Sequence, residues 1–395
     1  MFTMKHLLLT TIAAVLLGGT ALAFRANAQT SKTIEKAPEE FIEANDINDD
    51  GKLSIHEFPE RIRRKFDKVD TDNDGLVSAK ENKAYRASRS SGKKRKERNA
   101  ERRTERDGDT RIERDIVYAT VNGRDLLLDL YISEKVLKPA DAKHKDKLLP
   151  VIVWIHGGGW KGGSKGSGGI ARGAVDRGYA LIDVEYRLSG EAIFPAQFQD
   201  CKAAVRWVRA NSHKYGLDPK HIGVMGRSAG GHLVAFLGTS GDTDEFDTDS
   251  NAGHSSRVQA VCDLWGPTDL LQMDAHNLEG ARLIHDSPES PESRLVGGPI
   301  QKEPYRSLAV KANPIKYITK GQDLPPFLIV HGDSDLSVPP HQSQLLYDAL
   351  IKAEGDATLR FVKKGGHGLK GGDMSYKELL DVSIAFFDKH LKPTK

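Results

Sequence analysis

The stretch Ile222-Gly223-Val224-Met225-Gly226-Arg227-Ser228-Ala229-Gly230-Gly231-His232 decides the fold of this chain. A short apolar run ends in Gly-Arg-Ser-Ala-Gly, and a helix-like stretch follows. This pattern is typical of a nucleophile elbow, in which a strand enters, a serine occupies a cramped turn and a helix leaves. Glycines two residues either side of Ser228 would prevent a side-chain collision where strand and helix cross. The helix N-terminus would favour negative charge developing near Ser228 Oγ. The same pattern also occurs in ordinary turns. Whether Ser228 is a nucleophile therefore depends on motifs elsewhere in the chain.

Length and composition allow a large core together with polar segments outside it. The chain has 395 residues, which allows two or three domains. Its apolar content is 38%, low for a wholly globular chain, and its net charge is only +3. A specific nucleic-acid partner is therefore not expected. Cys201 and Cys262 could pair in an oxidising compartment or remain as buried thiols, and the sequence leaves both open.

The first 28 residues have the pattern of a secretory signal peptide. Lys5 provides the positive charge, residues 7–17 form the apolar region, and Ala26-Asn27-Ala28 is a cleavage motif before Gln29. The alternative is a membrane anchor, but the apolar run is short for one. We therefore predict a secreted or periplasmic protein whose mature form has no transmembrane helix.

Residues 34–84 contain two copies of a calcium-binding loop pattern. Both copies place oxygen ligands at loop positions 1, 3 and 5, a glycine at position 6, a backbone carbonyl at position 7 and a glutamate at position 12. The segment resembles an EF-hand pair, so a small all-α module that binds structural Ca²⁺ is expected. The predicted ligands are Asp46, Asn48, Asp50, Lys52 and Glu57 in the first loop, and Asp70, Asp72, Asp74, Leu76 and Glu81 in the second.

The two loops begin 24 residues apart, closer than in the familiar calcium-sensor pair. Leu53 and Val77 occupy position 8 of the loops, where apolar residues suit a short strand pairing between them. Dockerin modules also carry closely spaced calcium loops, so a docking role stays open. The region lacks a Met-rich groove, which favours structural calcium binding over a sensing role.

Residues 85–114 are highly charged and almost free of apolar side chains, so they cannot bury a core. The simpler interpretation is a solvated or partly helical linker. Alternatively, the basic run at residues 93–98 tethers the protein to an anionic envelope or polysaccharide.

From residue 115 to 393, apolar strand patterns alternate with helical ones, which predicts an α/β domain with a mainly parallel sheet and helices on both faces. Functional residues gather at the carboxyl ends of the strands in such sheets. The expected strands are residues 115–121, 125–132, 151–155, 179–184, 222–225, 258–263, 326–330 and 358–362. The clearest helical patterns cover residues 194–211, 340–353 and 376–391.

Directly after the expected strand 151–155 comes His156-Gly157-Gly158-Gly159-Trp160. This motif upstream of Gly-x-Ser-x-Gly resembles the α/β-hydrolase fold, in the carboxylesterase branch that includes hormone-sensitive-lipase-like and feruloyl- or acetyl-esterase-like enzymes. The resemblance covers nearly all of residues 115–393. It implies that the N–H groups of Gly158, Gly159 and Ala229 form an oxyanion hole.

The resemblance also implies a Ser-Asp-His chain order for the catalytic triad. After the strand 326–330, the stretch His331-Gly332-Asp333-Ser334-Asp335-Leu336-Ser337-Val338-Pro339 places the family's acid at Asp335, with Asp333 as the competitor. After the strand 358–362, a Gly-rich loop carries His367. The predicted catalytic residues are therefore Ser228, Asp335 and His367.

These patterns favour a secreted serine carboxylic-ester hydrolase with a calcium module and no catalytic cofactor. Together with secretion, the resemblance to feruloyl- and acetyl-esterases implies acetyl, feruloyl or similar short acyl and aryl esters as substrates, including those on polysaccharides. A lipase or aryl esterase of the same fold is an alternative, and a calcium-dependent docking or adhesion protein with an inert hydrolase domain is another. Arg227 stands where many relatives carry an acid, and the long polar stretch 274–317 either shapes the pocket or is a solvated excursion.

Overall fold

The computed structural model describes residues 42–43, 45–46, 50–55, 57, 69–70, 74–83, 104–137, 148–241 and 243–392. The chain divides into two compact units, Met1–Ala100 and Glu101–Lys395. In the described ranges, no helix is both long and apolar enough to cross a membrane. The predicted signal peptide, residues 1–28, lies outside them.

The described part of the first unit is organised by a short two-stranded sheet. Strand β1 (Lys52–Ser54) pairs antiparallel with β2 (Leu76–Ser78), and Leu53 lies opposite Val77. Both side chains are fully buried and pack with Ile42 and Val69. The predicted pairing of the two loops through their apolar position 8 is therefore confirmed.

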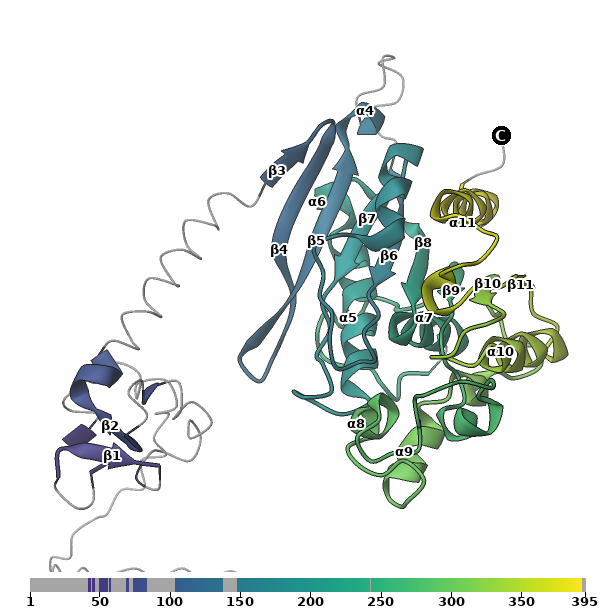
Figure 1. Cartoon of the computed structure of the whole chain (residues 1–395). Helices are drawn as coiled ribbons and strands as arrows, with labels where there is room; N and C mark the ends of the chain where they lie inside the picture. Colours follow the sequence, from purple (N-terminus) through teal and green to yellow (C-terminus); the bar gives the residue numbers. More distant parts are fainter. Residues whose placement is uncertain are drawn as a thin grey trace, which may run out of the picture. The chain divides into compact units, whose positions relative to one another are not determined.

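The second unit is built on a sheet in which nine described strands are hydrogen-bonded in the order β11-β10-β9-β8-β6-β7-β5-β4-β3. The pairs from β7 to β11 are parallel, whereas β3, β4 and β5 form an antiparallel edge (Figure 1). The mainly parallel α/β sheet predicted from the sequence is confirmed. The strands are β3 (Thr104–Asp107), β4 (Thr110–Val121), β5 (Arg124–Ser133), β6 (Leu149–Ile155), β7 (Ala180–Val184), β8 (Leu217–Arg227), β9 (Ala260–Leu264), β10 (Phe327–Gly332) and β11 (Ala357–Val362).

Helices cover both faces of this sheet because its central strands are apolar on both sides. In β6, Val153 and Ile155 belong to one core cluster, whereas Ile152 and Trp154 belong to the other. The helices are α4 (Glu134–Leu137), η4 (Gly169–Arg177), α5 (Ala196–Ala210), α6 (Ser212–Tyr215), α7 (Ala229–Thr239), η5 (Leu270–Gln272), η6 (Asp274–His276), α8 (Pro291–Val296), α9 (Tyr305–Lys311), η7 (Pro314–Tyr317), α10 (His341–Lys352), η8 (His367–Leu369) and α11 (Tyr376–Leu391).

The two cysteines are free buried thiols, which decides the question that the sequence left open. Cys201 lies on α5 in the core cluster that also contains α7 and α10 residues. Cys262 lies on β9 and faces the other cluster, with α11. The sheet therefore separates the two sulfurs, and a disulfide between them is excluded.

The sheet begins earlier than the sequence predicted. The sequence predicts a linker at residues 85–114, but strand β3 and the start of β4 lie within this range. The predicted linker therefore extends too far at its C-terminal end. Every side chain of β3 is exposed, and its sequence Thr-Glu-Arg-Asp has no apolar alternation that could reveal a strand. Backbone pairing with β4 holds it at the sheet edge, together with exposed ion pairs of Glu105, Arg106 and Asp107. Residues 85–103 lie outside the described residues.

Strand β8 is central in the sheet, and its packing against α11 leaves no room at Gly223. A Cβ there would lie 2.6 Å from Phe387 Cε1 and 2.8 Å from Leu391 Cδ1. Gly223 is therefore required for the C-terminal helix to reach the sheet.

We expect Gly223→Ala to lower the free energy of unfolding by about 1–3 kcal/mol, because α11 must shift outward. Urea unfolding followed by tryptophan fluorescence measures this in the second unit alone, since Trp154, Trp160, Trp207 and Trp265 are all four tryptophans of the chain. Gly190→Ala is the control, because a Cβ at Gly190 would meet nothing within 4 Å. Equal stability of the two variants would contradict the packing argument.

Candidate active site

The turn after β8 has the strained geometry of a nucleophile elbow. Ser228 has φ 52° and ψ −124°, a conformation that a non-glycine residue rarely adopts. A Cβ at Gly226 would lie 2.3 Å from the carbonyl oxygen of Gly230, and a Cβ at Gly230 would lie 2.1 Å from that of Ile155. The predicted collision between strand and helix is confirmed at Gly226, whereas Gly230 is required because α7 packs against the end of the neighbouring strand β6. The turn places Ser228 directly at the N-terminus of α7.

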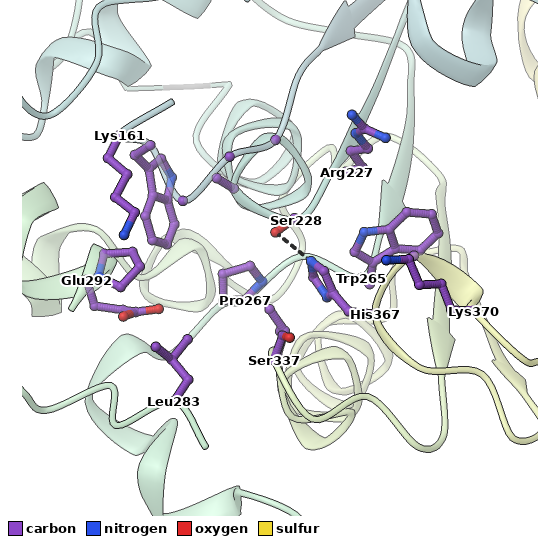
Figure 2. A pocket seen from close by; sticks show the side chains of 18 of the residues that line it. Lys161, Arg227, Ser228, Trp265, Pro267, Leu283, Glu292, Ser337, His367 and Lys370 are labelled. Atoms are coloured by element: carbon purple, nitrogen blue, oxygen red, sulfur yellow. Dashed lines mark hydrogen bonds between the residues drawn. The ribbon is translucent and has the colours of Figure 1, made fainter. Parts of the chain in front are cut away.

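Ser228, His367 and Asp335 lie in one hydrogen-bonded chain, although they come from three loops. His367 Nε2 is 3.2 Å from Ser228 Oγ (Figure 2). His367 Nδ1 is 2.7 Å from Asp335 Oδ2. Nδ1 therefore donates to the carboxylate, and Nε2 is left to accept the proton of the serine hydroxyl. The structure brings together the three residues that the sequence singled out.

The environment of Asp335 keeps this carboxyl ionised. Burial opposes its ionisation, but hydrogen bonds from His331 and His367 outweigh burial and hold its pKa well below the usual range. Its Oδ1 also accepts from the backbone N–H groups of Ser337 and Val338. Asp333, the competing acid, is exposed and accepts a hydrogen bond from the neighbouring Ser334 hydroxyl. The geometry selects Asp335 over Asp333.

The sequence analysis assigned no role to His331, which only begins the motif that contains Asp335. The structure places it fully buried, with Nδ1 2.7 Å from Ser343 Oγ and Nε2 3.0 Å from the carbonyl oxygen of Val338. The same Nε2 is 3.4 Å from Asp335 Oδ2. His331 therefore ties the Asp335 turn to α10. Its position four residues before Asp335 is a signal that could have indicated this contact.

The glycine-rich loop after β6 lies against the serine. Gly158 has φ 116° and Gly159 has φ 57°, and a Cβ at Gly158 would lie 2.3 Å from the carbonyl oxygen of Gly162. No acceptor among the described residues is hydrogen-bonded to the backbone N–H groups of Gly158, Gly159 or Ala229. All three residues line the pocket around Ser228. Their N–H groups are therefore available to a ligand.

The loop is held in this shape from beneath. His156 stacks on Tyr186 with ring centroids 4.3 Å apart, and the Tyr186 hydroxyl donates to the His156 carbonyl oxygen. Further along, Asp183 Oδ2 accepts from the N–H groups of Gly166 and Gly168, at 2.7 Å each. These contacts fix both ends of the glycine-rich loop to strand β7 and the segment after it.

The serine opens into a pocket of about 460 Å³ whose lining mixes apolar and charged side chains (Figure 2). Leu283, Pro291 and Glu292 come from the long stretch 274–317, which therefore forms part of the pocket wall. Arg227 also lines it, as the elbow sequence suggested. The lining residues are Gly157, Gly158, Gly159, Trp160, Lys161, Arg227, Ser228, Ala229, Trp265, Pro267, Leu283, Pro291, Glu292, Ser337, Val338, His367, Gly368, Lys370 and Tyr376.

Sequence reasoning missed Trp265, Lys161, Lys370 and Glu292 as pocket residues. Trp265 packs edge-on against His367, with ring centroids 6.4 Å apart. Lys161 directly follows the glycine motif and Lys370 lies three residues after His367, so proximity to these motifs could have indicated both. Glu292 lies in a segment without regular periodicity, and no pattern in the sequence points to it.

The buried carboxyl group of Asp263 packs against the first turn of α7, next to the elbow. Asp263, at the end of β9, is fully buried, and its Oδ1 accepts from the N–H of Gly266 at 2.9 Å. A Cβ at Gly231 would lie 2.3 Å from the same oxygen, so α7 packs directly on the carboxyl. Burial raises the pKa of Asp263 to about 7. Its Oδ2 has no hydrogen-bond partner in the described structure.

In each loop of the first unit, the aspartate at position 1 accepts a hydrogen bond from the backbone N–H of the glycine at position 6. Asp46 Oδ2 accepts from the N–H of Gly51 at 2.7 Å, and Asp70 Oδ2 accepts from that of Gly75 at 3.0 Å. Asp70 is buried, and its Oδ1 has no hydrogen-bond partner among the residues that the structure describes. An orphaned carboxylate oxygen of this kind fits a cation ligand.

The position 12 glutamates turn back to their own loops. Glu57 Oε2 accepts from Ser54, and Glu81 Oε2 accepts from Ser78. Lys52 and Asp74 form an ion pair between the loops. Within the described ranges, no three His, Cys, Asp or Glu side chains gather as a metal site requires. The position 3 ligands, Asn48 and Asp72, lie outside those ranges.

Comparison with known proteins places the second unit in a family. The family model described as BD-FAE matches residues 136–350, more than half of the chain. Among curated proteins, the esterase LipC of Mycobacterium tuberculosis is 31% identical over 206 residues, which is 52% of this chain and 49% of LipC. The chain thus spans about half the length of the curated relatives it matches.

The matches to two solved structures extend over nearly the full length of those chains. A truncated carbohydrate esterase from gut microbiota has 29% sequence identity and a TM-score of 0.55, over 70% of this chain and 96% of that one. A thermophilic esterase from the planctomycete Thermogutta terrifontis, solved with butyrate bound, has 27% identity and a TM-score of 0.54, over 71% and 96%. Both are similar to this chain in fold and in sequence.

We expect Asp263→Asn to remove a pH dependence of stability. Because the pKa of Asp263 is about 7 in the folded chain and about 4 when unfolded, the native state holds this proton more tightly. Its contribution to stability is complete below about pH 4 and is lost as the pH rises through about 7. The free energy of unfolding of the wild type should therefore fall relative to the variant, by an order of 1–2 kcal/mol between about pH 5 and 7.

Urea unfolding followed by tryptophan fluorescence at each pH measures this difference. Asp333→Asn removes an exposed carboxyl and should reproduce the wild-type profile. Parallel profiles for wild type and Asp263→Asn would show that Asp263 is not neutral in the folded protein near pH 6.

Proposed function

The chain belongs to the BD-FAE family, and on that premise we propose that it is a carboxylesterase whose catalytic residues are Ser228, His367 and Asp335. The observation that carries the proposal is the hydrogen-bonded chain from Asp335 through His367 to the strained serine, at the base of an open pocket. Esterases among its relatives support the same activity.

In the proposed reaction, His367 Nε2 takes the proton of the Ser228 hydroxyl while Oγ bonds to the ester carbonyl carbon. The charged imidazolium is stabilised by Asp335. The proton then passes from Nε2 to the leaving alkoxide as the carbon–oxygen bond breaks, which releases the alcohol and leaves an acyl-serine. A water molecule, deprotonated by the same nitrogen, releases the carboxylic acid and restores the serine.

The N–H groups of Gly158, Gly159 and Ala229 are the proposed oxyanion hole. They line the pocket beside Ser228 without an acceptor of their own, so they can bind the oxyanion without first breaking another hydrogen bond. In mutagenesis of such holes, one donor contributes roughly 3 kcal/mol to transition-state stabilisation. The dipole of α7 acts in the same direction.

We propose short acyl esters of carbohydrates as the substrates. The relative solved with butyrate is an esterase that holds a short acyl group, and another is named a carbohydrate esterase. The charged side chains around the serine suit a polar alcohol better than a lipid, which makes a lipase the weaker alternative. An inert docking protein would have no need for the Asp335–His367–Ser228 relay.

Further proposals concern the first hundred residues. The signal motif supports export, and the basic run at residues 93–98 supports contact with an anionic envelope or polysaccharide. The two loop patterns and the orphaned oxygen of Asp70 support calcium binding by the position 1, 3, 5, 7 and 12 ligands. Calcium would cross-link each loop and take no part in ester hydrolysis.

Replacing Ser228 with alanine should lower the turnover of p-nitrophenyl acetate by about five orders of magnitude or more, because the nucleophile is lost. Reaction with a fluorescent fluorophosphonate should disappear together with turnover. Asp333→Ala is the control, since this exposed side chain lies on the same turn as Asp335 but outside the relay. Retained turnover in Ser228→Ala would reject the proposed nucleophile, provided that circular dichroism shows an intact fold.

Removing calcium should affect the first unit and leave hydrolysis unchanged. Titration calorimetry of the full chain should detect two calcium sites, and Glu57→Gln with Glu81→Gln should weaken both by about tenfold or more, because each loop loses its bidentate ligand. Glu279→Gln, an exposed change in the second unit, is the matched control. Loss of p-nitrophenyl acetate turnover in EDTA would contradict the separation of the two roles.

A further inference from the structure

The pocket around Ser228 has an excess of positive charge. Its described lining contains three cations, Lys161, Arg227 and Lys370, and one carboxylate, Glu292. All three cationic side chains are exposed, and within the described chain none of them is ion-paired. In contrast, two partly buried cations of the same unit have carboxylate partners, Arg187 with Asp200 and Lys165 with Asp129. The charge at the pocket is therefore left for a ligand.

These cations flank the serine on two sides. Figure 2 shows Lys161 beside Glu292 on one side of Ser228, and Arg227 and Lys370 on the other side, near Trp265. An anionic group bound close to the scissile ester would meet a cation on either side. A neutral ester would leave all three cations solvated and would gain nothing from them.

The positive surface continues beyond the pocket. A second hollow of about 420 Å³ shares Lys161 with the first and is lined by Arg294 on α8, together with Ser189, Ser293 and Ile193. Arg294 donates through Nε to the carbonyl oxygen of Glu289 and forms no ion pair with any described residue. Lys161 therefore joins two adjacent hollows, and an extended substrate could lie in both.

Glu292, the carboxylate of the described lining, is buried beneath the pocket surface. It is 3% exposed, and its Oε1 is 3.0 Å from Nδ1 of the fully buried His285. Its Oε2 has no hydrogen-bond partner in the described structure, although the residue lines the pocket. A buried carboxylate oxygen without a donor is costly to leave unpaired. Less than 1 Å² of this oxygen is accessible, so it lies beneath the pocket surface and leaves the positive charge of the cations uncompensated at the surface.

From these observations we infer that the ester sits on an acidic glycan, a polysaccharide with carboxylate or sulfate groups near the acylated hydroxyl. The inference rests on the proposed esterase function and narrows its substrate class. Lys161 and Arg294 bind the anionic groups of successive sugar units. Arg227 and Lys370 add to the positive potential that attracts the polymer.

The test uses two substrates that differ in charge at the same positions: O-acetylated trigalacturonate and the same trimer with its carboxyl groups converted to neutral primary amides, which are not esters. Released acetate gives kcat/KM for each, and the ratio of the two cancels general losses of activity. The wild type should prefer the acidic trimer by about tenfold or more at low salt, and the preference should shrink at about 0.5 M NaCl. Sulfated and unsulfated acetyl-xylotriose form a second pair, which shows whether carboxylate or sulfate is preferred.

Lys161→Glu and Arg294→Glu should each lower the ratio by about tenfold, because each replaces attraction with repulsion. Lys220→Glu is the matched control: this exposed lysine lies in the first half of β8, at the opposite end of the strand from Ser228. A ratio near one in the wild type for both pairs, or a ratio unaffected by Lys161→Glu, overturns the inference. In either case, continued hydrolysis of p-nitrophenyl acetate would leave the esterase proposal standing, whereas its absence would reject that proposal itself.

Discussion

The structure of the second unit depends on the close packing of α7 against β8 and the end of β6, where no side-chain atom fits at Gly226 or Gly230. The two glycines flanking the elbow bring the carbonyl oxygens of Gly230 and Ile155 to within 2.3 Å of where a Cβ would stand. This packing forces Ser228 into a backbone conformation that costs about 1–3 kcal/mol. Burial of every residue of α7 against the sheet offsets this strain. Because α7 is packed firmly against the sheet, Ser228 at its N-terminus stays exposed to the pocket.

The same sheet brings the other participants to the serine. Because β6, β8, β10 and β11 are parallel, the loops that follow them all leave at one edge. Gly332 and Val362 are register partners at the ends of β10 and β11, so the turns carrying Asp335 and His367 start side by side. Ser228, Asp335 and His367 are far apart in sequence, but short loops after the strands are enough to bring them together. The geometry of the relay is largely a consequence of strand order and register.

Features fixed by steric or register constraints could be predicted from the sequence, and features fixed by irregular packing could not. The glycines around Ser228 and after β6 mark positions where only a bare backbone fits, and the apolar strands report burial on both faces. Strand β3 gave no signal because its side chains are all exposed. Glu292 and the wall around it belong to a segment of short helices and turns, whose path depends on contacts with the rest of the fold rather than on local periodicity. The family resemblance favoured Asp335 over Asp333, and the structure adds the physical reason: Asp335 is buried and accepts from His367 and two backbone N–H groups, whereas Asp333 is exposed.

The charges around the site divide into two kinds with different consequences. Buried ionic groups such as Asp335 and Asp129 are fixed by several partners, so they orient the machinery and do not select a substrate. Exposed lysines and arginines at the pocket keep their water and their side-chain freedom. One contact of this kind contributes only about 0–1 kcal/mol, since solvent screens it. Selectivity for an acidic substrate must therefore come from several such contacts acting on one chain, which requires a polymer long enough to span both hollows. A repeating glycan meets this requirement, whereas a single small anion does not.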